Sequence, residues 1–524
     1  MHRTKIVCTI GTHTVRKGVG QALDALVRAG MDVIRMNMSY AGGAYTMESQ
    51  IVDWAQDIGY RLENRTIAVM ADLQGIKFRV RGLPGGEIPV PEGGEIWLRS
   101  DSNFAQEAET IPIPNSLFPL IGPYVAEHGH MKIYFGDGDI IVNACEVMDD
   151  GCLRAKVVIG GTLKNGKGVT LQGVDIQVPE MLTEKDKGDL RWIAKNGGIT
   201  FIALSFVQSA QDIRELRRFM VQECGVDAEN VPPVIAKIET RRAVDNIDEI
   251  LDEAYGIMLA RGDMGLQIGV EKVTEVQKTV IRKCQIRGKP VITATQMLTS
   301  METKLEPQRA EVSDIFNAIL DGTDAIMLSG ETSAGNYPVE AVQMMAKVAI
   351  EAENYRIKQD QAFPEEFLER LNSMQIESHQ TRLGRGKATA DLISHAAVVF
   401  TASDALQIKA ILTPTTSGKT TRLISRFRPH CMIIAAAHKL DTARQLALSY
   451  GVIPLYIRQG PTETLEHIFG ISIRRAVKRN LLGVGDVVVF SGGYPMWQAG
   501  TTNLLKIHVV EKEEVERDGH TKLF

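Results

Sequence analysis

A lysine and two carboxylates have the types and the spacing for metal and phosphate chemistry. Lys237 and Glu239 end a short apolar run that starts at Val234, and because they are two positions apart they share one face of a strand. Asp263 follows a second apolar run at residues 256–260. Neighbouring parallel strands would bring these side chains to one end of a sheet, where carboxylates hold a divalent cation and an ammonium faces an oxyanion or a phosphate. A surface cluster of ion pairs is the alternative that these residues alone leave open.

The segments that must position these side chains alternate between strand and helix patterns. Outside one insert we count eight strand–helix units, which is typical of a (β/α)8 barrel (a TIM barrel) of the α/β class; an open doubly wound sheet usually stops nearer six strands. The expected strands are residues 5–10, 31–38, 66–73, 199–206, 233–239, 256–260, 290–296 and 324–329, and the expected helices are residues 18–30, 44–64, 183–196, 212–224, 242–253, 271–287, 307–321 and 338–353.

The pattern changes in two places, and these changes predict the domain boundaries. Within residues 77–178, short alternating runs are separated by Gly, Pro and turn signals such as Asn165-Gly166, which predicts a small inserted β-barrel domain. Residues 358–387 are polar and poorly periodic, which predicts a linker. We therefore expect a barrel made of residues 1–76 and 179–356, and a linker with a C-terminal α/β domain at 357–524. The charged tail at 511–524 is expected to fray.

Polar side chains follow the expected strands at the end where barrel enzymes place their active sites. So many charged and hydroxyl side chains at one end favour a functional site over a merely solvated surface. These residues are Arg35, Asn37, Ser39, Asp72, Lys237, Glu239, Arg261, Gly262, Asp263, Thr295, Gln296, Ser329, Glu331 and Thr332.

Composition narrows the class of protein. The chain has 524 residues, 44% of them hydrophobic and 23% charged, as in soluble globular proteins with several domains. Its net charge of -5 gives no reason to expect nucleic acid or an anionic membrane as partner. The six cysteines have no metal-binding spacing, and no run has the length of a membrane span or the pattern of a signal peptide. We expect a cytoplasmic protein with reduced thiols.

Seven stretches carry a more specific signal. They are RTKIVCTIG at 3–11, GMDVIRMNMS at 30–39, IAKIE at 235–239, GIMLARGDMG at 256–265, KPVITATQMLTSM at 289–301, RAEVSDIFNAILDGTDAIMLSGET at 309–332 and TTSGKTTRLISRFRP at 415–429. In this order and spacing they resemble the pyruvate kinase family over almost the whole chain. That family has a barrel, a capping β domain and a C-terminal α/β domain, which is the organisation inferred above from the patterns alone.

The resemblance implies phosphoryl transfer from phosphoenolpyruvate to ADP, giving pyruvate and ATP in glycolysis. It assigns Glu239 and Asp263 to a Mg²⁺ (or Mn²⁺) ion, and Lys237 to the transferring phosphoryl group and the enolate left behind. Arg35 would clamp the phosphate, and the backbone N–H groups around Gly262 and Asp263 would bind the substrate carboxylate.

The remaining assignments concern the proton and the nucleotide. The resemblance places Thr295, with Ser329 and Glu331 nearby, where it would help to protonate the enolate, although water is an alternative donor. Residues expected to bind the nucleotide are Asn37, Arg79 and Lys167, with the inserted domain closing as a lid. For Lys167 a solvated turn lysine is the alternative.

The chain departs from the family beside the third strand. Family members bind K⁺ through the equivalents of Asn37, Ser39, Asp72 and the Leu73 carbonyl, with a glutamate close by; here that glutamate is Lys77. Because a fixed ammonium supplies the charge that a bound K⁺ would provide, we predict activity that does not need K⁺. A lysine solvated in the hinge is the alternative.

The loop Thr415, Thr416, Ser417, Gly418, Lys419, Thr420 fails as a P-loop because the first glycine of that motif is absent. It resembles the effector loop of the family, and its hydroxyls and N–H groups at a helix start suit a sugar phosphate; a helix cap is the alternative. Because Arg and Lys are sparse in the facing loop at 491–502, a monophosphate or no effector at all is expected rather than a bisphosphate. The family resemblance also implies a homotetramer.

Two other functions stay open at this point. One is a metal-dependent lyase or aldolase that acts on pyruvate or phosphoenolpyruvate in the same kind of barrel. The other is a catalytically silent paralogue that senses sugar phosphates. The intact set of Lys237, Glu239 and Asp263 favours the phosphotransferase over both.

Overall fold

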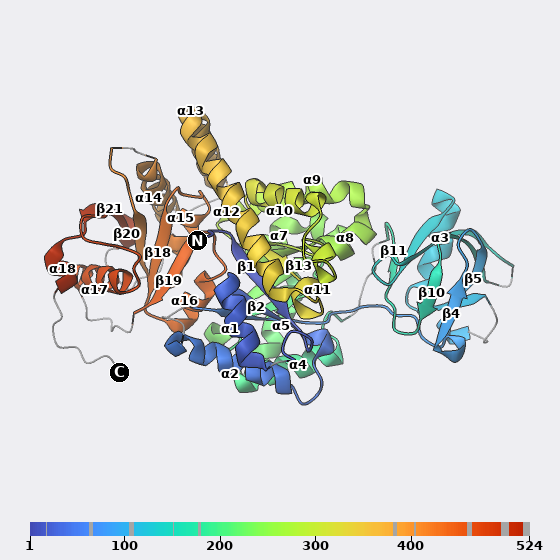
Figure 1. The fold of residues 1–524 in the computed structure, drawn as a ribbon. Coiled ribbons are helices and arrows are strands. Elements are labelled where there is room, and N and C mark those ends of the chain that lie inside the picture. The colour runs from blue at the N-terminus through green and yellow to red at the C-terminus, as the bar shows by residue number, and fades with distance from the viewer. Residues whose placement is uncertain are drawn as a thin grey trace.

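The computed structural model arranges the chain as three units in a row (Figure 1), with the barrel between the inserted domain and the C-terminal domain. The structure describes residues 1–16, 18–61, 66–103, 109–149, 151–174, 176, 180–380, 385–402, 405–457, 464–493 and 502–516. Among these residues, no helix combines the length and the apolar content that a membrane crossing requires.

The central unit is a closed barrel of eight parallel strands, as predicted. The strands follow one another around the barrel in the order β1-β16-β15-β14-β13-β12-β3-β2. Side chains such as Val7, Phe201 and Met258 fill the interior and are fully buried. The strands are β1 Lys5–Ile10, β2 Val33–Asn37, β3 Ala68–Asp72, β12 Phe201–Leu204, β13 Val234–Ile238, β14 Gly256–Ala260, β15 Val291–Ala294 and β16 Ala325–Leu328.

Helices surround the barrel, and their ends follow local sequence signals. Thr183 and Asp186 form a reciprocal capping box that starts α4, as their spacing predicts. One expected helix is divided, because residues 242–253 lie in α6 and α7, and an additional helix that was not predicted, α8, precedes α9. The helices are α1 Val19–Ala29, α2 Thr46–Arg61, α4 Glu184–Asn196, α5 Ala210–Gln222, α6 Arg241–Asp245, α7 Ile247–Glu253, α8 Arg261–Ile268, α9 Val270–Arg287, α10 Arg309–Asp321, α11 Gly330–Ser333 and α12 Pro338–Ala362.

The insert between β3 and α4 is rich in strands. One sheet has the order β11-β7-β8-β9-β5-β6, and a smaller one pairs β10 with β4. The insert also contains α3 Phe118–His128, a helix that the alternating pattern did not predict, with Ile121 and Val125 buried one turn apart. The strands are β4 Glu87–Val90, β5 Glu95–Ser100, β6 Thr110–Ile113, β7 Met131–Phe135, β8 Ile140–Val147, β9 Leu153–Ile159, β10 Gly161–Lys164 and β11 Val169–Leu171.

The C-terminal domain is built on a five-stranded sheet in the order β19-β18-β17-β20-β21, in which β21 is antiparallel to its neighbour. The strands are β17 Ala410–Thr415, β18 Met432–Ala437, β19 Val452–Tyr456, β20 Val487–Gly493 and β21 Thr502–Val509. The helices are α14 Arg385–Thr401, α15 Lys419–Ser425, α16 Leu440–Leu446, α17 Leu465–Lys478 and α18 Lys512–Glu516.

The prediction of a linker without regular structure at 358–387 is wrong for the described part of that range; residues 381–384 lie outside it. Helix α12 continues to Ala362, and α13 Pro364–Gln380 follows it almost directly. The reason is a helical apolar spacing that the many charges obscured: Phe367, Leu371 and Met374 are buried in the core of the C-terminal domain. The tail is also helical at α18, so fraying is wrong for that part, and residues 517–524 lie outside the described residues.

Candidate functional site

Lys237 is the centre of a buried polar cluster at the C-terminal end of the barrel. Its Nζ donates to Ser205 Oγ (2.6 Å) and lies 3.1 Å from both Asp72 Oδ1 and Glu239 Oε1. The three partners come from the ends of β12, β3 and β13, which are consecutive around the barrel. A lysine ammonium has three N–H donors, and each of them therefore has an acceptor in this state.

The opposite charges in this cluster stabilise the ionised forms of Lys237 and Asp72. Burial acts to lower the pKa of Lys237, but the carboxylates of Asp72 and Glu239 outweigh it, so the pKa is raised. Burial likewise acts to raise the pKa of Asp72, and the cations of Lys237 and Arg35 outweigh it, so that pKa is lowered. Lys237 is therefore an ammonium and Asp72 a carboxylate at neutral pH.

Arg35 lies beside Lys237 and is fixed by two hydrogen bonds. Its Nε donates to Asp72 Oδ2 (2.6 Å) and its Nη1 to Thr9 Oγ1 (2.8 Å). Neither bond uses Nη2, so one side of the guanidinium remains available to a phosphoryl oxygen.

Glu239 and Asp263 are the two carboxylates that the sequence analysis assigns to the metal. Burial raises the pKa of Glu239, the neighbouring Asp263 adds to the rise and Lys237 opposes it. The N–H of Phe206 donates to Glu239 Oε2 at 2.6 Å, and Phe206 adopts a positive φ of 56° to do so. The like charges of Glu239 and Asp263 repel each other, and a bound divalent cation would relieve that repulsion.

The two carboxylates form a small donor set. Across the described residues no group of three or more His, Cys, Asp or Glu side chains is placed to hold a metal. Mg²⁺ is usually held by one or two protein carboxylates together with waters and substrate oxygens, and this donor set fits that pattern.

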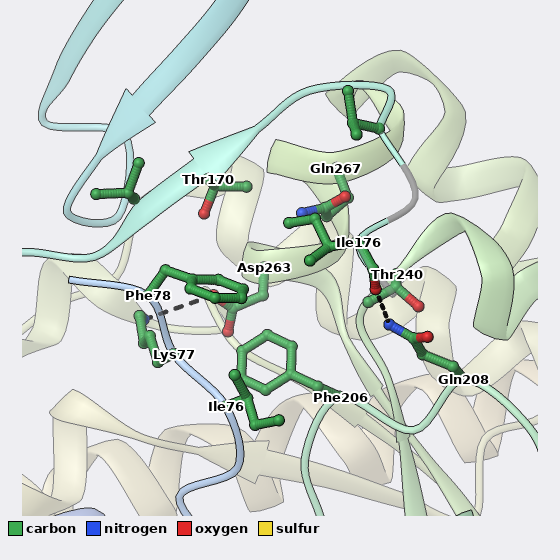
Figure 2. Close-up of a pocket in the computed structure, with 12 residues that line it drawn as sticks. Ile76, Lys77, Phe78, Thr170, Ile176, Phe206, Gln208, Thr240, Asp263 and Gln267 are labelled. Atoms are coloured by element: carbon green, nitrogen blue, oxygen red, sulfur yellow. Dashed lines mark hydrogen bonds and ion pairs between the residues drawn. The ribbon is translucent and has the colours of Figure 1, made fainter. Parts of the chain in front are cut away.

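Lys77 lies in the hinge between the barrel and the insert. Its Nζ is 3.7 Å from Asp263 Oδ1 and 3.6 Å from Asp137 Oδ1 of the insert. Figure 2 shows Lys77 directed at Asp263 at the edge of a cleft with apolar walls that include Phe78 and Phe206. The ammonium therefore faces the expected metal ligand, and its ion pairs with described residues are with Asp263 and Asp137 and not with the expected K⁺ ligands.

Those four expected K⁺ ligands lie at the ends of β2 and β3. Asn37 Oδ1 accepts from the N–H of Ser39 (3.2 Å), and the Leu73 carbonyl accepts from Ser205 Oγ (2.7 Å). The carboxylate of Asp72 is shared between Arg35 and Lys237 as described above.

Thr295 follows β15 in a backbone conformation that L residues rarely adopt. Its φ is 69°, and the φ of the next residue, Gln296, is 56°. Thr295 Oγ1 accepts from the N–H of Gly262 (2.8 Å) and donates to the carbonyl of Ala294 (2.6 Å). In this state the Gly262 N–H expected to meet a substrate carboxylate is already occupied, so substrate would have to replace the threonine.

Arg261 stabilises the loop that contains Thr295. Its guanidinium binds both oxygens of Asp314 (2.8 and 2.6 Å), and Nη2 also donates to the Thr295 carbonyl (2.8 Å). The fork geometry fixes the plane of the guanidinium, which in turn orients the Thr295 backbone.

Ser329 and Glu331 follow β16, the neighbour of β15. Glu331 is buried, and its two oxygens accept from the N–H groups of Leu298 (2.9 Å) and Ser329 (2.7 Å). Glu331 thus connects two loops, whereas Ser329 Oγ is buried and has no hydrogen-bond partner among the residues that the structure describes.

The expected nucleotide ligands lie at the base of the insert. Arg79 Nη1 donates to the Gly166 carbonyl (2.7 Å), and Lys167 Nζ binds Asp139 Oδ2 (2.6 Å); both pairs are exposed. The hydrogen bond to Asp139 raises the pKa of Lys167.

The expected effector loop joins β17 to α15. Gly418 has a positive φ of 74°, and its N–H donates to Thr415 Oγ1 at 2.9 Å. The Thr416 carbonyl accepts from Thr442, and Thr420 Oγ1 lies 2.5 Å from Thr502 Oγ1. Most of the facing loop, at 494–501, lies outside the described residues.

Comparisons with known proteins bear on this arrangement. The family profile described as "Pyruvate kinase, barrel domain" matches residues 1–342, and the profile "Pyruvate kinase, alpha/beta domain" matches residues 391–508. The chain belongs to the pyruvate kinase family. The pyruvate kinase of Sporosarcina psychrophila is 37% identical over 510 residues, which cover 97% of this chain and 81% of that protein. For the pyruvate kinase of Geobacillus stearothermophilus the identity is 38% over 514 residues, covering 97% and 80%.

A solved structure supports the same assignment. The crystal structure of a pyruvate kinase from Cryptosporidium parvum superposes with a TM-score of 0.82 at 30% sequence identity, covering 97% of this chain and 96% of that one. As a member of the pyruvate kinase family the chain is a phosphotransferase, which decides against the lyase and the silent paralogue.

Ser205 is the residue of this pyruvate kinase site that the sequence analysis missed. It follows the fourth strand, and the expected strand at 199–206 ran past it, so it was counted as part of the strand. The observed β12 ends at Leu204, which places Ser205 at the same strand end as its partners. Polar residues that follow a strand were taken as site candidates. Ser205 would have been among them if the predicted strand had ended at Leu204.

Proposed function

We propose that this chain transfers the phosphoryl group of phosphoenolpyruvate to ADP at the cluster centred on Lys237. The observation that carries the proposal is a charged lysine held within 3.1 Å of Asp72 and Glu239, in a buried position beside Arg35 and Asp263. Phosphoryl transfer needs fixed positive charge where oxyanions develop, and Lys237 and Arg35 supply it in this cluster.

Glu239 and Asp263 would hold Mg²⁺ or Mn²⁺. The bound ion would neutralise phosphoryl and carboxylate oxygens and lower the barrier to transfer. The chain's own residues prepare this place: the Phe206 N–H orients Glu239, and Lys77 offsets the negative charge of Asp263.

Lys237 would stabilise the transferring group and then the enolate. All three of its N–H donors have acceptors here, so a phosphoryl oxygen must replace one of them, and the pair with Glu239 is the one that cation binding weakens. A contact of unit charges near 4 Å at an effective dielectric of about 20 contributes ~4 kcal/mol. If that contact forms mainly in the transition state, it accelerates the reaction roughly a thousandfold.

Arg35 would bind the phosphate through its remaining N–H groups, with Asp72 and Thr9 keeping the guanidinium in place. The substrate carboxylate would meet the start of α8 at Gly262 and Asp263 after displacing Thr295 Oγ1. The freed Thr295 hydroxyl would then lie near the enolate and could relay a proton to it from water.

We further propose that the reaction does not require K⁺. The supporting observation is the Lys77 ammonium, 3.7 Å from Asp263 and only 26% exposed. Lys77 puts a permanent positive charge next to the anionic substrates, which is what a monovalent cation would otherwise add.

Residues 77–178 would act as the lid, with Arg79 and Lys167 at its base and Asn37 on the barrel available to ADP. For the loop at 415–420 we propose a sugar monophosphate, and for the assembly a homotetramer, which light scattering would check. We expect a cytoplasmic enzyme.

The test is ATP formation from phosphoenolpyruvate and ADP by the full-length protein, with Mg²⁺ varied. We expect turnover that depends on Mg²⁺, and Mn²⁺ binding seen by electron paramagnetic resonance that weakens in Asp263→Asn. Lys195→Met, an exposed change on α4, is the matched control for handling and folding. Absence of ATP formation by correctly folded protein would refute the proposal.

A further inference from the structure

One arginine of the C-terminal domain lies against the loop at 415–420. Arg422 is on α15, the helix that follows this loop, and its guanidinium turns back over the loop. Its Nη1 donates to the Ser417 carbonyl at 3.2 Å. A side-chain carbon at Gly418 would lie 2.9 Å from the same nitrogen, so the guanidinium is packed on the loop backbone. A change in the loop therefore acts directly on Arg422.

The same guanidinium also contacts the barrel. Arg422 Nη1 donates to the hydroxyl of Tyr255 at 3.1 Å, and Arg422 Cζ lies 4.9 Å from the centroid of the Tyr255 ring. A guanidinium over the face of an aromatic ring is attracted to it by a cation–π interaction. The two N–H groups of Nη1 thus have one acceptor in the C-terminal domain and one in the barrel. Arg422 is therefore a direct link between the loop and the barrel.

Tyr255 belongs to the packing of the barrel interior. Its N–H donates to the Val234 carbonyl at 2.9 Å, and its ring centroid lies 5.4 Å from that of Phe201, the first residue of β12. The ring packs against the apolar side chains that fill the barrel. Burial raises the pKa of Tyr255, so the phenol is neutral and keeps its O–H. A displacement of this ring would disturb the core on which the strands rest.

The strand that follows Tyr255 leads to the metal site. Tyr255 immediately precedes β14, and Asp263 follows three residues after the end of that strand. All five residues of β14 are buried, and the strand is paired on both sides, with Met258 in register with Lys237 of β13. A close-packed strand of this kind transmits a displacement because it has no free space in which to absorb it.

We propose that Arg422 is a positioning residue through which an anion in the loop at 415–420 changes the affinity of the metal site at Asp263. The inference rests on the proposed binding of a sugar monophosphate to that loop. In the present state Arg422 donates to two neutral acceptors, the Ser417 carbonyl and the Tyr255 hydroxyl. A phosphoryl oxygen is a charged acceptor and binds a guanidinium more strongly than either of them. An anion in the loop therefore draws the guanidinium away from Tyr255 and releases the start of β14.

The coupling is tested on the full-length protein by the Kd of Mn²⁺, measured by electron paramagnetic resonance with and without saturating glucose 6-phosphate. Calorimetry measures the binding of the sugar phosphate itself. In the wild type we expect the Kd of Mn²⁺ to change roughly fivefold or more. Arg422→Met should have, without sugar phosphate, the Mn²⁺ Kd of the sugar-phosphate-bound wild type, and that Kd should no longer respond. Tyr255→Phe, which keeps the ring, should respond less than the wild type.

The matched control is Lys439→Met, which removes an exposed cation of the C-terminal domain at the start of α16. It should keep the full response, and circular dichroism melting confirms that each variant is folded. A full response in Arg422→Met, with glucose 6-phosphate bound, would overturn the inference.

Failure of the loop to bind is a distinguishable result. If calorimetry shows no binding of glucose 6-phosphate to the wild type, the effector role proposed for the loop is refuted, and the link is then judged from the variants alone. Arg422→Met must still alter the Kd of Mn²⁺, and it must do so less in a Tyr255→Phe background, where the hydroxyl contact is already lost. An equal Kd of Mn²⁺ in Arg422→Met and the wild type would overturn the link.

Discussion

Charge reversal at Lys77 tests the account of K⁺ independence most sharply. The perturbation is Lys77→Glu, which places a carboxylate where the ammonium now faces Asp263. For unit charges 3.7 Å apart, an effective dielectric of about 20 gives about 4 kcal/mol for the attraction that is lost, and the repulsion that replaces it has a similar size. The two side chains are 26% and 31% exposed, so screening reduces each of these terms to about 1 kcal/mol, or about 2 kcal/mol together.

That energy predicts the kinetic effect. A loss of about 2 kcal/mol in the transition state lowers turnover roughly 30-fold, and K⁺ should restore much of it in Lys77→Glu. The assay compares initial rates of ATP formation with K⁺ and with tetramethylammonium at equal ionic strength. The wild type should show equal rates in both, and Lys77→Met should lie between it and Lys77→Glu.

The control for this series is Lys156→Met, which removes an exposed lysine of the insert. It should behave as the wild type in both buffers. Background activity of the wild type without K⁺, restored by K⁺, would refute the reasoning, because the ammonium would then not replace the cation.

Three further changes follow from the contacts of the site and of the domain interface. Ser205→Ala removes an acceptor from Lys237 and a donor to the Leu73 carbonyl, so it should cost about 1–3 kcal/mol of unfolding free energy by urea titration and also lower kcat. Arg261→Lys loses the fork to Asp314 and should lower kcat roughly 10- to 100-fold with little change in KM, since it only positions Thr295; an unchanged kcat would contradict this role. Burial lowers the pKa of Lys289 to about 8, so the unfolded chain binds more protons than the folded protein between pH 8 and about 10.5. The free energy of unfolding therefore rises with pH in this window. Lys289→Met should be more stable than the wild type at pH 7, and urea titration should show that this difference disappears by about pH 10.5.

The sequence predicted the barrel because its signals are local and repeated. Apolar runs such as β1 and β14 were predicted with their observed ends, and polar residues after the strands located the site. Closure of the barrel then brings Asp72, Ser205 and Lys237 together, which follows from strand order and needs no knowledge of individual contacts.

Other features depend on contacts between distant segments. The sequence analysis missed helix α13 because its apolar residues, such as Phe367 and Leu371, are few among many charged residues. They are buried only because the C-terminal domain packs on them. The sequence placed Lys77 near a cation site, but it did not predict that Lys77 pairs with Asp263. That contact depends on the course of the backbone between the barrel and the insert. The interface between the barrel and the C-terminal domain joins residues of both, as in the ion pair of Arg428 with Asp324, and nothing in their spacing along the sequence relates them.

The measurement that tests the central claim most directly is the single-turnover rate of phosphoryl transfer in Lys237→Met, with Mg²⁺ and both substrates saturating. The buried ammonium between Asp72 and Glu239 predicts a rate roughly a thousandfold below that of the wild type, with folded secondary structure by circular dichroism. A rate within a few-fold of the wild type in a folded variant would contradict the assignment of the chemistry to this cluster.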